Sequence, residues 1–195
     1  MFSVNIDKLV ATTPAQEKAY KELCNRVLAK GRKYKTLAVI GESGYALRLA
    51  TAIVDAGNKV LFVDADVTTP VFMGKYRLGK NLEGMCEYLD GTQDDDKIRC
   101  LTNRSDLNII FSGESSRQTL SQSDEDRLRK FLDDNMDDYD YIILEAGKSA
   151  EVARNCRASL VLIDDSEYSP RDAREKIEFY DNEGCLVLGV VITNA

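Results

Sequence analysis

The residues best able to do chemistry stand where three apolar stretches of the sequence give way to polar ones. The first stretch runs into Gly41-Glu42-Ser43-Gly44, the second ends at Asp64 and Asp66, and the third ends at Glu145. A glycine turn that enters a helix can present backbone N–H groups to an anion. Two carboxylates at positions i and i+2 can hold hydrated Mg²⁺ or orient a nucleophile. These groups are the parts of a phosphate-binding site.

The glycine turn nevertheless departs from a working phosphate-binding loop. Such a P-loop reads G-x-x-x-x-G-K-[ST]: its N–H groups wrap the phosphates, its lysine neutralises them and its hydroxyl holds Mg²⁺. Here only two residues separate Gly41 from Gly44. Tyr45 stands in the place of the lysine, and Ala46 stands in the place of the hydroxyl. We therefore expect a phosphate site that has lost its charged and metal-binding groups.

Each remaining polar residue has a functional and a structural interpretation. Arg48 could substitute for the missing lysine, as could Lys148, but a solvated helix face is the commoner place for an arginine. Asp64 and Asp66 could hold a metal ion or cap a turn. Glu145 could act as the acidic residue that P-loop enzymes keep at this strand end, or serve as a loop charge.

Composition limits the possible functions. The 195 residues are 44% hydrophobic and 30% charged, which is typical of one globular domain. A net charge of −7 disfavours nucleic acid as a partner. The absence of histidine excludes Ser-His-Asp and Cys-His chemistry. The sequence shows neither an apolar run that could insert into a membrane nor a signal peptide, so we expect a cytoplasmic location.

Helices and strands alternate along the chain in the way that positions such a site. A capped helix is predicted over 15–29 and a second over about 44–56, followed by further helices at 121–136, 149–154 and 169–181. The pattern predicts an α/β fold with an open, mostly parallel sheet and helices on both faces, which binds ligands at the strands' carboxyl ends. We expect a single domain over 1–195, with an amino-terminal helix and connector at 1–34 and the α/β core at 35–195. The predicted strands lie at 36–40, 59–63, 107–111, 140–145, 158–163 and 185–192.

Taken in order, six segments resemble one known family over nearly the whole chain. They are similar to motifs in the cytoplasmic ATP-binding domain of bacterial tyrosine kinases of capsular and exopolysaccharide synthesis. That family belongs to the P-loop NTPase-like proteins of the deviant Walker A group, together with ParA/MinD-type ATPases. The segments are Lys18–Cys24, Gly41–Tyr45, Gly57–Pro70, Leu82–Gly91, Tyr139–Glu145 and Gly189–Asn194.

The resemblance implies roles for individual residues. The family's catalytic carboxylates correspond to Asp64, Asp66 and Glu145, and the first two would also hold Mg²⁺ in an active member. In these kinases the tyrosine cluster that is autophosphorylated follows the last strand. This sequence ends at Ala195, which leaves open whether such a tail has been trimmed or was never present. The nucleotide-binding positions correspond to Gly41, Gly44, Tyr45, Ala46, Arg48 and Asn194.

The departures from the family fall on the chemistry and leave the apolar framework intact. We therefore expect a pseudo-ATPase or pseudokinase that acts as a regulatory or scaffold binding module and needs no cofactor. Its expected partner is a protein, such as the tail of a membrane polysaccharide co-polymerase or an active paralogue, which would bring it to the membrane without insertion. The alternatives are an active ATP-dependent tyrosine kinase or ATPase that uses Mg-ATP or Mg-ADP at a non-standard site, and a partitioning-type positioning switch.

Overall fold

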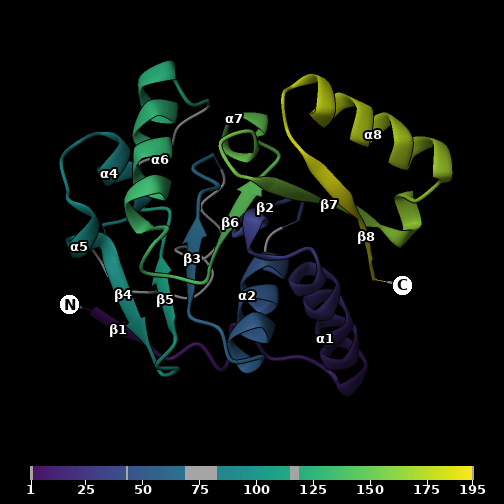
Figure 1. Cartoon of the computed structure of the whole chain (residues 1–195), viewed down its shortest axis with the longest axis horizontal. Coiled ribbons are helices and arrows are strands. Elements are labelled where there is room, and N and C mark those ends of the chain that lie inside the picture. Colours follow the sequence, from purple (N-terminus) through teal and green to yellow (C-terminus); the bar gives the residue numbers. More distant parts are fainter. Residues whose placement is uncertain (1, 43, 69–82, 115–118, 195) are drawn as a thin grey trace.

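A central sheet with helices on both faces makes up the part of the chain that the structure describes (Figure 1). This agrees with the open, mostly parallel α/β fold predicted from the sequence. The computed structural model describes residues 2–42, 44–68, 83–114 and 119–194. Outside these ranges lie four residues of the segments quoted above, namely Ser43, Thr69, Pro70 and Leu82.

The sheet contains eight strands among the described residues. They are β1 (Phe2–Val4), β2 (Thr36–Ile40), β3 (Val60–Asp64), β4 (Arg99–Thr102), β5 (Leu107–Ile110), β6 (Tyr141–Gly147), β7 (Ala158–Asp164) and β8 (Val187–Thr193). Their order across the sheet is β1-β4-β5-β3-β6-β2-β7-β8. Every neighbouring pair is parallel except β4 with β5. The carboxyl ends of β2, β3, β6 and β7 therefore meet at one edge of the sheet.

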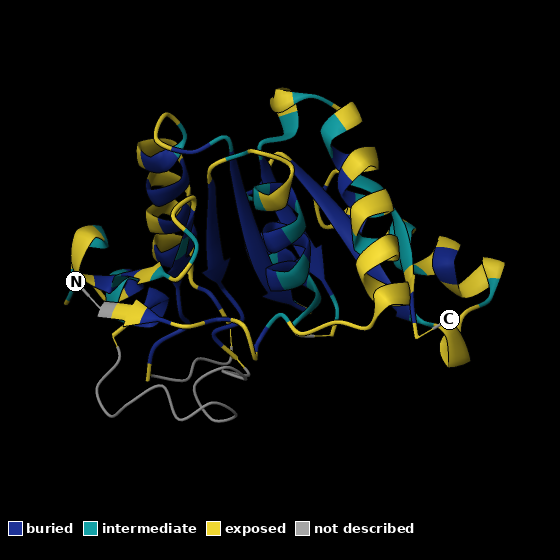
Figure 2. Cartoon of the chain, turned by 90° about the horizontal axis from the view of Figure 1, so that it is seen from below, coloured by how far each residue is buried: buried dark blue, intermediate teal, exposed yellow. Residues whose placement is uncertain are grey.

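The strands that carry the site are buried along their length. Every residue of β2, β3 and β6 is buried, which is the outcome expected of continuous apolar runs covered on both faces. Figure 2 shows these strands in dark blue between helices whose outer faces are yellow. The site is thus built at the ends of strands that are packed from both sides.

Two layers of helices enclose the sheet. α1 and α2 pack on one face, and α4, α5, α6, α7 and α8 contribute to the apolar core on the other. Thr13 caps α1, as expected from the Thr13-Pro14 pair, and Gln16 completes a capping box that was not predicted from the sequence. The helices are α1 (Pro14–Ala29), α2 (Tyr45–Asp55), α4 (Met85–Leu89), α5 (Asp95–Ile98), α6 (Gln122–Asn135), α7 (Ala150–Ala153) and α8 (Pro170–Asn182).

The predicted elements lie within two residues of the observed ones at each end. Four short elements were not predicted: β1, β4, α4 and α5. Each has only three to five residues, too few to show a period in the sequence, and β1 and β4 depend on pairing with distant strands. The segment 1–34, expected to hold a helix and a connector, therefore also contributes a strand to the sheet.

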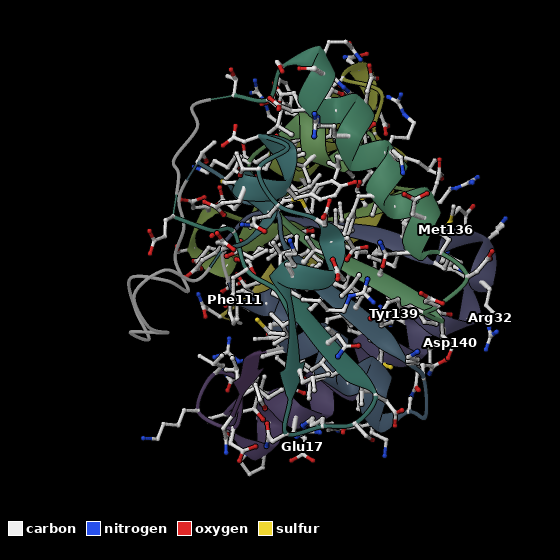
Figure 3. The ribbon with its side chains drawn as sticks, turned by 90° about the vertical axis from the view of Figure 1, so that its left-hand side faces the viewer. Glu17, Arg32, Phe111, Met136, Tyr139 and Asp140 are labelled. Carbon is white, nitrogen blue, oxygen red and sulfur yellow. The ribbon has the colours of Figure 1, made fainter. Side chains whose placement is uncertain are left out.

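A charged cluster fixes the end of the sheet opposite the site. Asp140, just before β6, forms an ion pair of 2.8 Å with Arg32 of the connector after α1 (Figure 3). Its other carboxylate oxygen accepts a hydrogen bond of 2.9 Å from the backbone N–H of Lys59, just before β3. One carboxylate thus aligns the amino ends of two site-bearing strands with the connector.

Candidate nucleotide site at the carboxyl ends of the strands

The glycine turn after β2 is pressed against the two neighbouring strands. The N–H of Gly41 donates to the carbonyl oxygen of Gly147 in β6 at 2.7 Å. A Cβ atom at Gly41 would lie 2.7 Å from Cβ of Leu162 in β7, and the φ angle of +136° also favours glycine. The turn is therefore tight, and at this residue it leaves no room for a side chain.

The backbone N–H of Gly44, just before α2, is hydrogen-bonded to a carboxyl group of the protein itself. Gly44, in the left-handed conformation with φ of 92°, precedes α2 and has no side-chain cap. Its N–H donates to both carboxylate oxygens of Glu145, at 3.2 and 3.1 Å. The contact exists because β6 lies beside β2, with Glu145 paired to Val39. In P-loop proteins an amide at this position faces a phosphate, so Glu145 stands where an anion would bind.

Burial makes the Glu145 carboxyl hard to ionise. Glu145 is only 2% exposed to solvent. Burial, followed by the nearby Asp64, raises the pKa of Glu145 to about 8, and the hydrogen bond from Gly44 offsets part of the rise. The pKa of Asp64, opposite Glu145 in β3, is raised to about 7, also mainly by burial. These two carboxyls hold protons well above the ordinary pH range of such groups.

One of the two carboxyl oxygens of Asp64 lacks a partner in the part of the chain that the structure describes. Among the described residues, its Oδ2 atom accepts no hydrogen bond. The Ser112 hydroxyl lowers the pKa of Asp64 somewhat, although Ser112 Oγ makes no hydrogen bond of normal geometry there. A buried polar atom without a partner is costly, so capping a turn does not account for Oδ2 of Asp64. Its role in a site remains a prediction.

Asp66 has a structural role at the same strand end. Its Oδ1 atom accepts hydrogen bonds from Thr68, from the backbone N–H at 3.2 Å and from the hydroxyl at 2.7 Å. Its Oδ2 atom would lie 2.4 Å from a Cβ atom at Gly147, where φ is +54°. Asp66 therefore caps the turn after β3 and packs against β6 at a point where only glycine fits.

The described residues contain no group of three or more histidine, cysteine, aspartate or glutamate side chains arranged to hold a metal ion. Mg²⁺ prefers six oxygen ligands and commonly takes only one or two from carboxylates, with waters and phosphates as the rest. Asp64 and Asp66 could supply such a pair of oxygens. Their role as metal ligands remains a prediction.

Tyr45 and Asn194 lie together, although they are far apart in the sequence. The Tyr45 hydroxyl donates to Oδ1 of Asn194 at 3.1 Å, and Nδ2 of Asn194 donates to Asp164 at 2.6 Å. The Tyr45 ring also lies near that of Tyr20 in α1, with centroids 6.5 Å apart. Ala46 is fully buried beneath the turn. Two of the predicted nucleotide-binding residues thus bind each other, a contact that the sequence did not reveal.

Arg48 is directed back toward the glycine turn. Its Nη1 atom donates to the carbonyl oxygen of Gly44 at 3.2 Å, and its Nε atom is buried with no partner among the described residues. Its charge lowers the pKa of Glu145 and that of Tyr20. The expectation of a solvated arginine is therefore wrong, because the side chain lies half-buried between α1 and α2.

Lys148 lies on a cleft beside the turn. The cleft has a volume of about 830 Å³ and is bounded by Gly41, the ends of β7 and β8, and α8. Two of its charged lining residues, Lys148 and Lys176, are basic. The acidic lining residues outnumber the basic ones. They are Glu42, Asp164, Glu167, Asp172 and Glu175. This excess of negative charge is unfavourable for a polyphosphate.

Comparisons with known proteins agree with this architecture. The sequence matches no protein-family model. It is 26% identical over 188 residues to the tyrosine-protein kinase CpsD of Streptococcus pneumoniae serotype 4, covering 90% of this chain and 83% of the relative. It is 23% identical over 199 residues to the CpsD of Streptococcus agalactiae serotype III, covering 96% and 86%.

Solved structures show the same fold. The kinase domain of the Escherichia coli tyrosine kinase ETK superposes with a TM-score of 0.79 at 22% identity, covering 92% of this chain and 77% of that one. The septum site-determining protein MinD of Pyrococcus horikoshii, complexed with Mg-ADP, gives a TM-score of 0.63 at 15% identity, covering 81% and 69%.

The sheet and its helices define a P-loop NTPase-like fold, with Glu145 hydrogen-bonded to the Gly44 amide at the carboxyl ends of the strands. Within that class, the chain is similar in sequence to bacterial tyrosine-protein kinases and shares its fold with their kinase domains and with MinD-type ATPases. The resemblance inferred from the motifs is thereby confirmed. No helix among the described residues has both the length and the apolar character to cross a membrane.

Proposed function

We propose that this chain is a pseudo-ATPase or pseudokinase, related to the tyrosine kinases of polysaccharide export, that acts as a regulatory or scaffold binding module. It would work in the cytoplasm without a nucleotide cofactor. Its partner would be a protein, either the cytoplasmic tail of a membrane polysaccharide co-polymerase or an active paralogue. Such a partner would hold it at the membrane.

The hydrogen bonds from Gly44 to Glu145 carry this proposal. A phosphate at the same amide would have to displace a carboxyl that is 98% removed from solvent and would approach Asp64 as well. Below a pH of about 8 the Glu145 carboxyl is mostly protonated and blocks the amide by occupying it. Above that pH its charge would also repel a phosphate, by about 4 kcal/mol for two unit charges about 4 Å apart at an effective dielectric of 20. No lysine at position 45 offsets that repulsion. Loss of even one charged contact to a reacting phosphate costs about two to three decades in rate.

A calorimetric titration with Mg·ATP, repeated with Mg·ADP, tests the proposal directly. We expect no heat of binding at micromolar nucleotide and no release of phosphate above background. Clear binding heat together with measurable turnover would contradict it. Circular dichroism of the same sample confirms that the protein is folded.

An active ATP-dependent tyrosine kinase or ATPase is the second candidate, and one observation favours it. Asp64 is buried at a strand end with Oδ2 lacking a partner among the described residues, as a residue awaiting a metal ion or a nucleophile would be. Lys148 on the cleft could then supply the missing positive charge. Replacing Asp64 with asparagine separates the candidates: unchanged phosphate release in D64N leaves no catalytic role for this carboxylate.

A further inference from the structure

The sheet ends in an edge strand that lacks the usual protection. β8 spans seven residues, Val187–Thr193, without a charged residue or a proline. It pairs with β7 on one side, and no backbone hydrogen bond from any other described segment reaches it. The unpaired N–H and C=O groups of an edge strand can pair with another strand. Most proteins prevent this with charged side chains, with prolines or by keeping the edge strand short. β1, at the other edge, has only three residues.

Exposed apolar side chains gather around this edge. Five large apolar residues are exposed in the described part of the chain, and four of them lie on β8, just before it, or on the segment that leads to it. A Cβ atom at Gly189, in the middle of β8, would meet nothing within 4 Å. Residues 187–191 of the strand are half-buried, Ile192 is exposed, and only Thr193 is buried. The four residues are Tyr168, Phe179, Leu186 and Ile192.

The two faces beside β8 differ in chemistry. On the α8 face, the segment 164–184 carries eight acidic and three basic side chains, a net charge of −5 out of the −7 of the whole chain. Phe179 of α8 is 54% exposed and packs edge-on against Tyr180 at 5.0 Å, beside the acidic cleft. An acidic surface with an exposed ring suits arginine or lysine side chains, which bind both carboxylates and aromatic faces.

On the α1 face the surface beside β8 is apolar. A pocket of about 280 Å³ lies between α1, α2 and the carboxyl ends of β7 and β8. Apolar side chains of a neighbouring strand would fit into it. The residues that give the pocket this character include Ala15, Ala19, Leu23, Leu160, Val191 and Ile192.

We propose that the outer edge of β8 binds an extended segment of a partner protein, in which basic and apolar side chains alternate. Successive side chains of a strand point to opposite faces of a sheet. Basic residues of an added strand would therefore meet α8, and apolar residues would meet the pocket beside α1, while the backbone pairs with β8. This proposal rests on the proposed role as a binding module and specifies the surface and the chemistry of its partner.

A second copy of the chain fits this edge poorly. Pairing two β8 strands would bring two segments 164–184, each with a net charge of −5, onto one shared sheet. Like charges placed that closely oppose association. A basic partner segment would instead be attracted by the negative charge that repels a second copy.

Fluorescence anisotropy with synthetic peptides tests the proposal on the full chain. The probe is a fluorescein-labelled heptapeptide of alternating valine and arginine. We expect saturable binding, at least about tenfold weaker binding of the valine–glutamate peptide, and a similar loss when alternate peptide amides are N-methylated. Equal binding of the glutamate peptide would overturn the charge argument. Equal binding of the N-methylated peptide would overturn strand addition.

Two variants locate the site. Phe179→Ala removes the exposed ring, and Glu175→Lys reverses a charge on the cleft, so each is expected to weaken peptide binding about fivefold. Asp126→Lys makes the same charge change on α6, on an exposed side chain away from β8, and should leave binding unchanged. Circular dichroism verifies folding of all three variants. If Asp126→Lys weakened peptide binding as much as Glu175→Lys, the change in net charge would explain both effects. That result would overturn the proposed site.

Sedimentation of the protein alone provides the remaining test. We expect a monomer at the concentrations used for peptide binding. A dimer that is lost in the Phe179→Ala variant would assign the edge to a second copy and overturn the proposed occupant. Because no nucleotide enters these experiments, failure here is distinguishable from failure of the proposed function, which the Mg·ATP titration decides.

Discussion

The backbone N–H of Gly44, at the start of α2, donates to both carboxylate oxygens of Glu145 at the end of β6. Gly44 follows β2 and Glu145 lies in the neighbouring strand β6, so two residues 101 positions apart in the sequence come into contact. This amide faces a carboxyl group of the protein, which burial keeps protonated up to a pH of about 8. Under the proposed function, Glu145 thus occupies an amide that would otherwise be available to a phosphate.

Protein stability should fall as the pH rises from about 5 to about 8. Burial raises the pKa of Glu145 to about 8 in the folded state, above its ordinary value of 4.5. The folded state thus keeps a proton that the unfolded state has lost, so the stabilisation is complete below pH 4.5 and is lost up to pH 8. Urea unfolding between pH 5 and 9 should show a decrease of roughly 1–4 kcal/mol.

The Glu145→Gln variant is the control for this pH dependence. Glutamine keeps a hydrogen-bond acceptor for Gly44 but does not titrate. We expect a flatter stability profile, with the remaining slope due to Asp64, whose pKa is raised to about 7. An E145Q profile as steep as that of the wild type would show that Glu145 is not the titrating group.

Restoring the lost side chains should not restore nucleotide binding. The double variant Tyr45→Lys, Ala46→Ser recreates the lysine and hydroxyl of a P-loop. Glu145 still occupies the Gly44 amide, and the loop remains too short to encircle a phosphate. We expect no calorimetric binding of micromolar Mg·ATP by the folded double variant. Micromolar affinity of the double variant for Mg·ATP would show that the absence of the lysine and the hydroxyl is by itself what prevents binding.

Gly147→Ala should destabilise the fold strongly. Its Cβ atom would lie 2.4 Å from Oδ2 of Asp66, and φ is +54°. The clash adds to the left-handed backbone cost, for a total of roughly 2–4 kcal/mol in urea unfolding. Gly31→Ala is the matched control, since φ is +85° there but nothing lies within 4 Å. It should cost only about 1–2 kcal/mol. Equal costs would show that Asp66 moves aside freely.

Arg154→Met should destabilise the contact between α6 and α7. Nε of Arg154 donates to the almost fully buried Glu125 at 2.8 Å, and its charge lowers the pKa of that carboxyl. Removing the partner leaves a buried charge and should cost roughly 2–3 kcal/mol at pH 7 in urea unfolding. This contribution exists above the ordinary pKa of glutamate and is lost as the pH falls through the lowered value. The loss from R154M should therefore shrink in acid.

Arg171→Met is the control for that prediction. Arg171 pairs with Glu175 at 2.7 Å on α8, but its side chain is 85% exposed. Solvent screens such a pair, so the substitution should change stability by about 0.5 kcal/mol or less. A similar cost in both variants would mean that burial of Glu125 does not matter.

The sequence predicted the long elements well because their apolar periods are local. The runs that became β2, β3, β6 and β7, and the start of α1 at Thr13-Pro14, needed no knowledge of distant residues. The sequence also located the polar strand ends, because parallel strands bring their carboxyl ends to one edge. Short elements such as β1 and β4 escaped prediction, since three or four residues acquire strand structure only through pairing with a remote segment.

The sequence by itself determined the fold and showed that the phosphate loop lacks its lysine, its hydroxyl and its length. Only the tertiary structure decided which groups took their place: Glu145 at the Gly44 amide, Tyr45 on Asn194, and Arg48 turned inward. The physical reason is that these contacts depend on strand order. The packing of the whole sheet places β2 beside β6. The local sequence around Gly44 or Glu145 does not encode that neighbourhood.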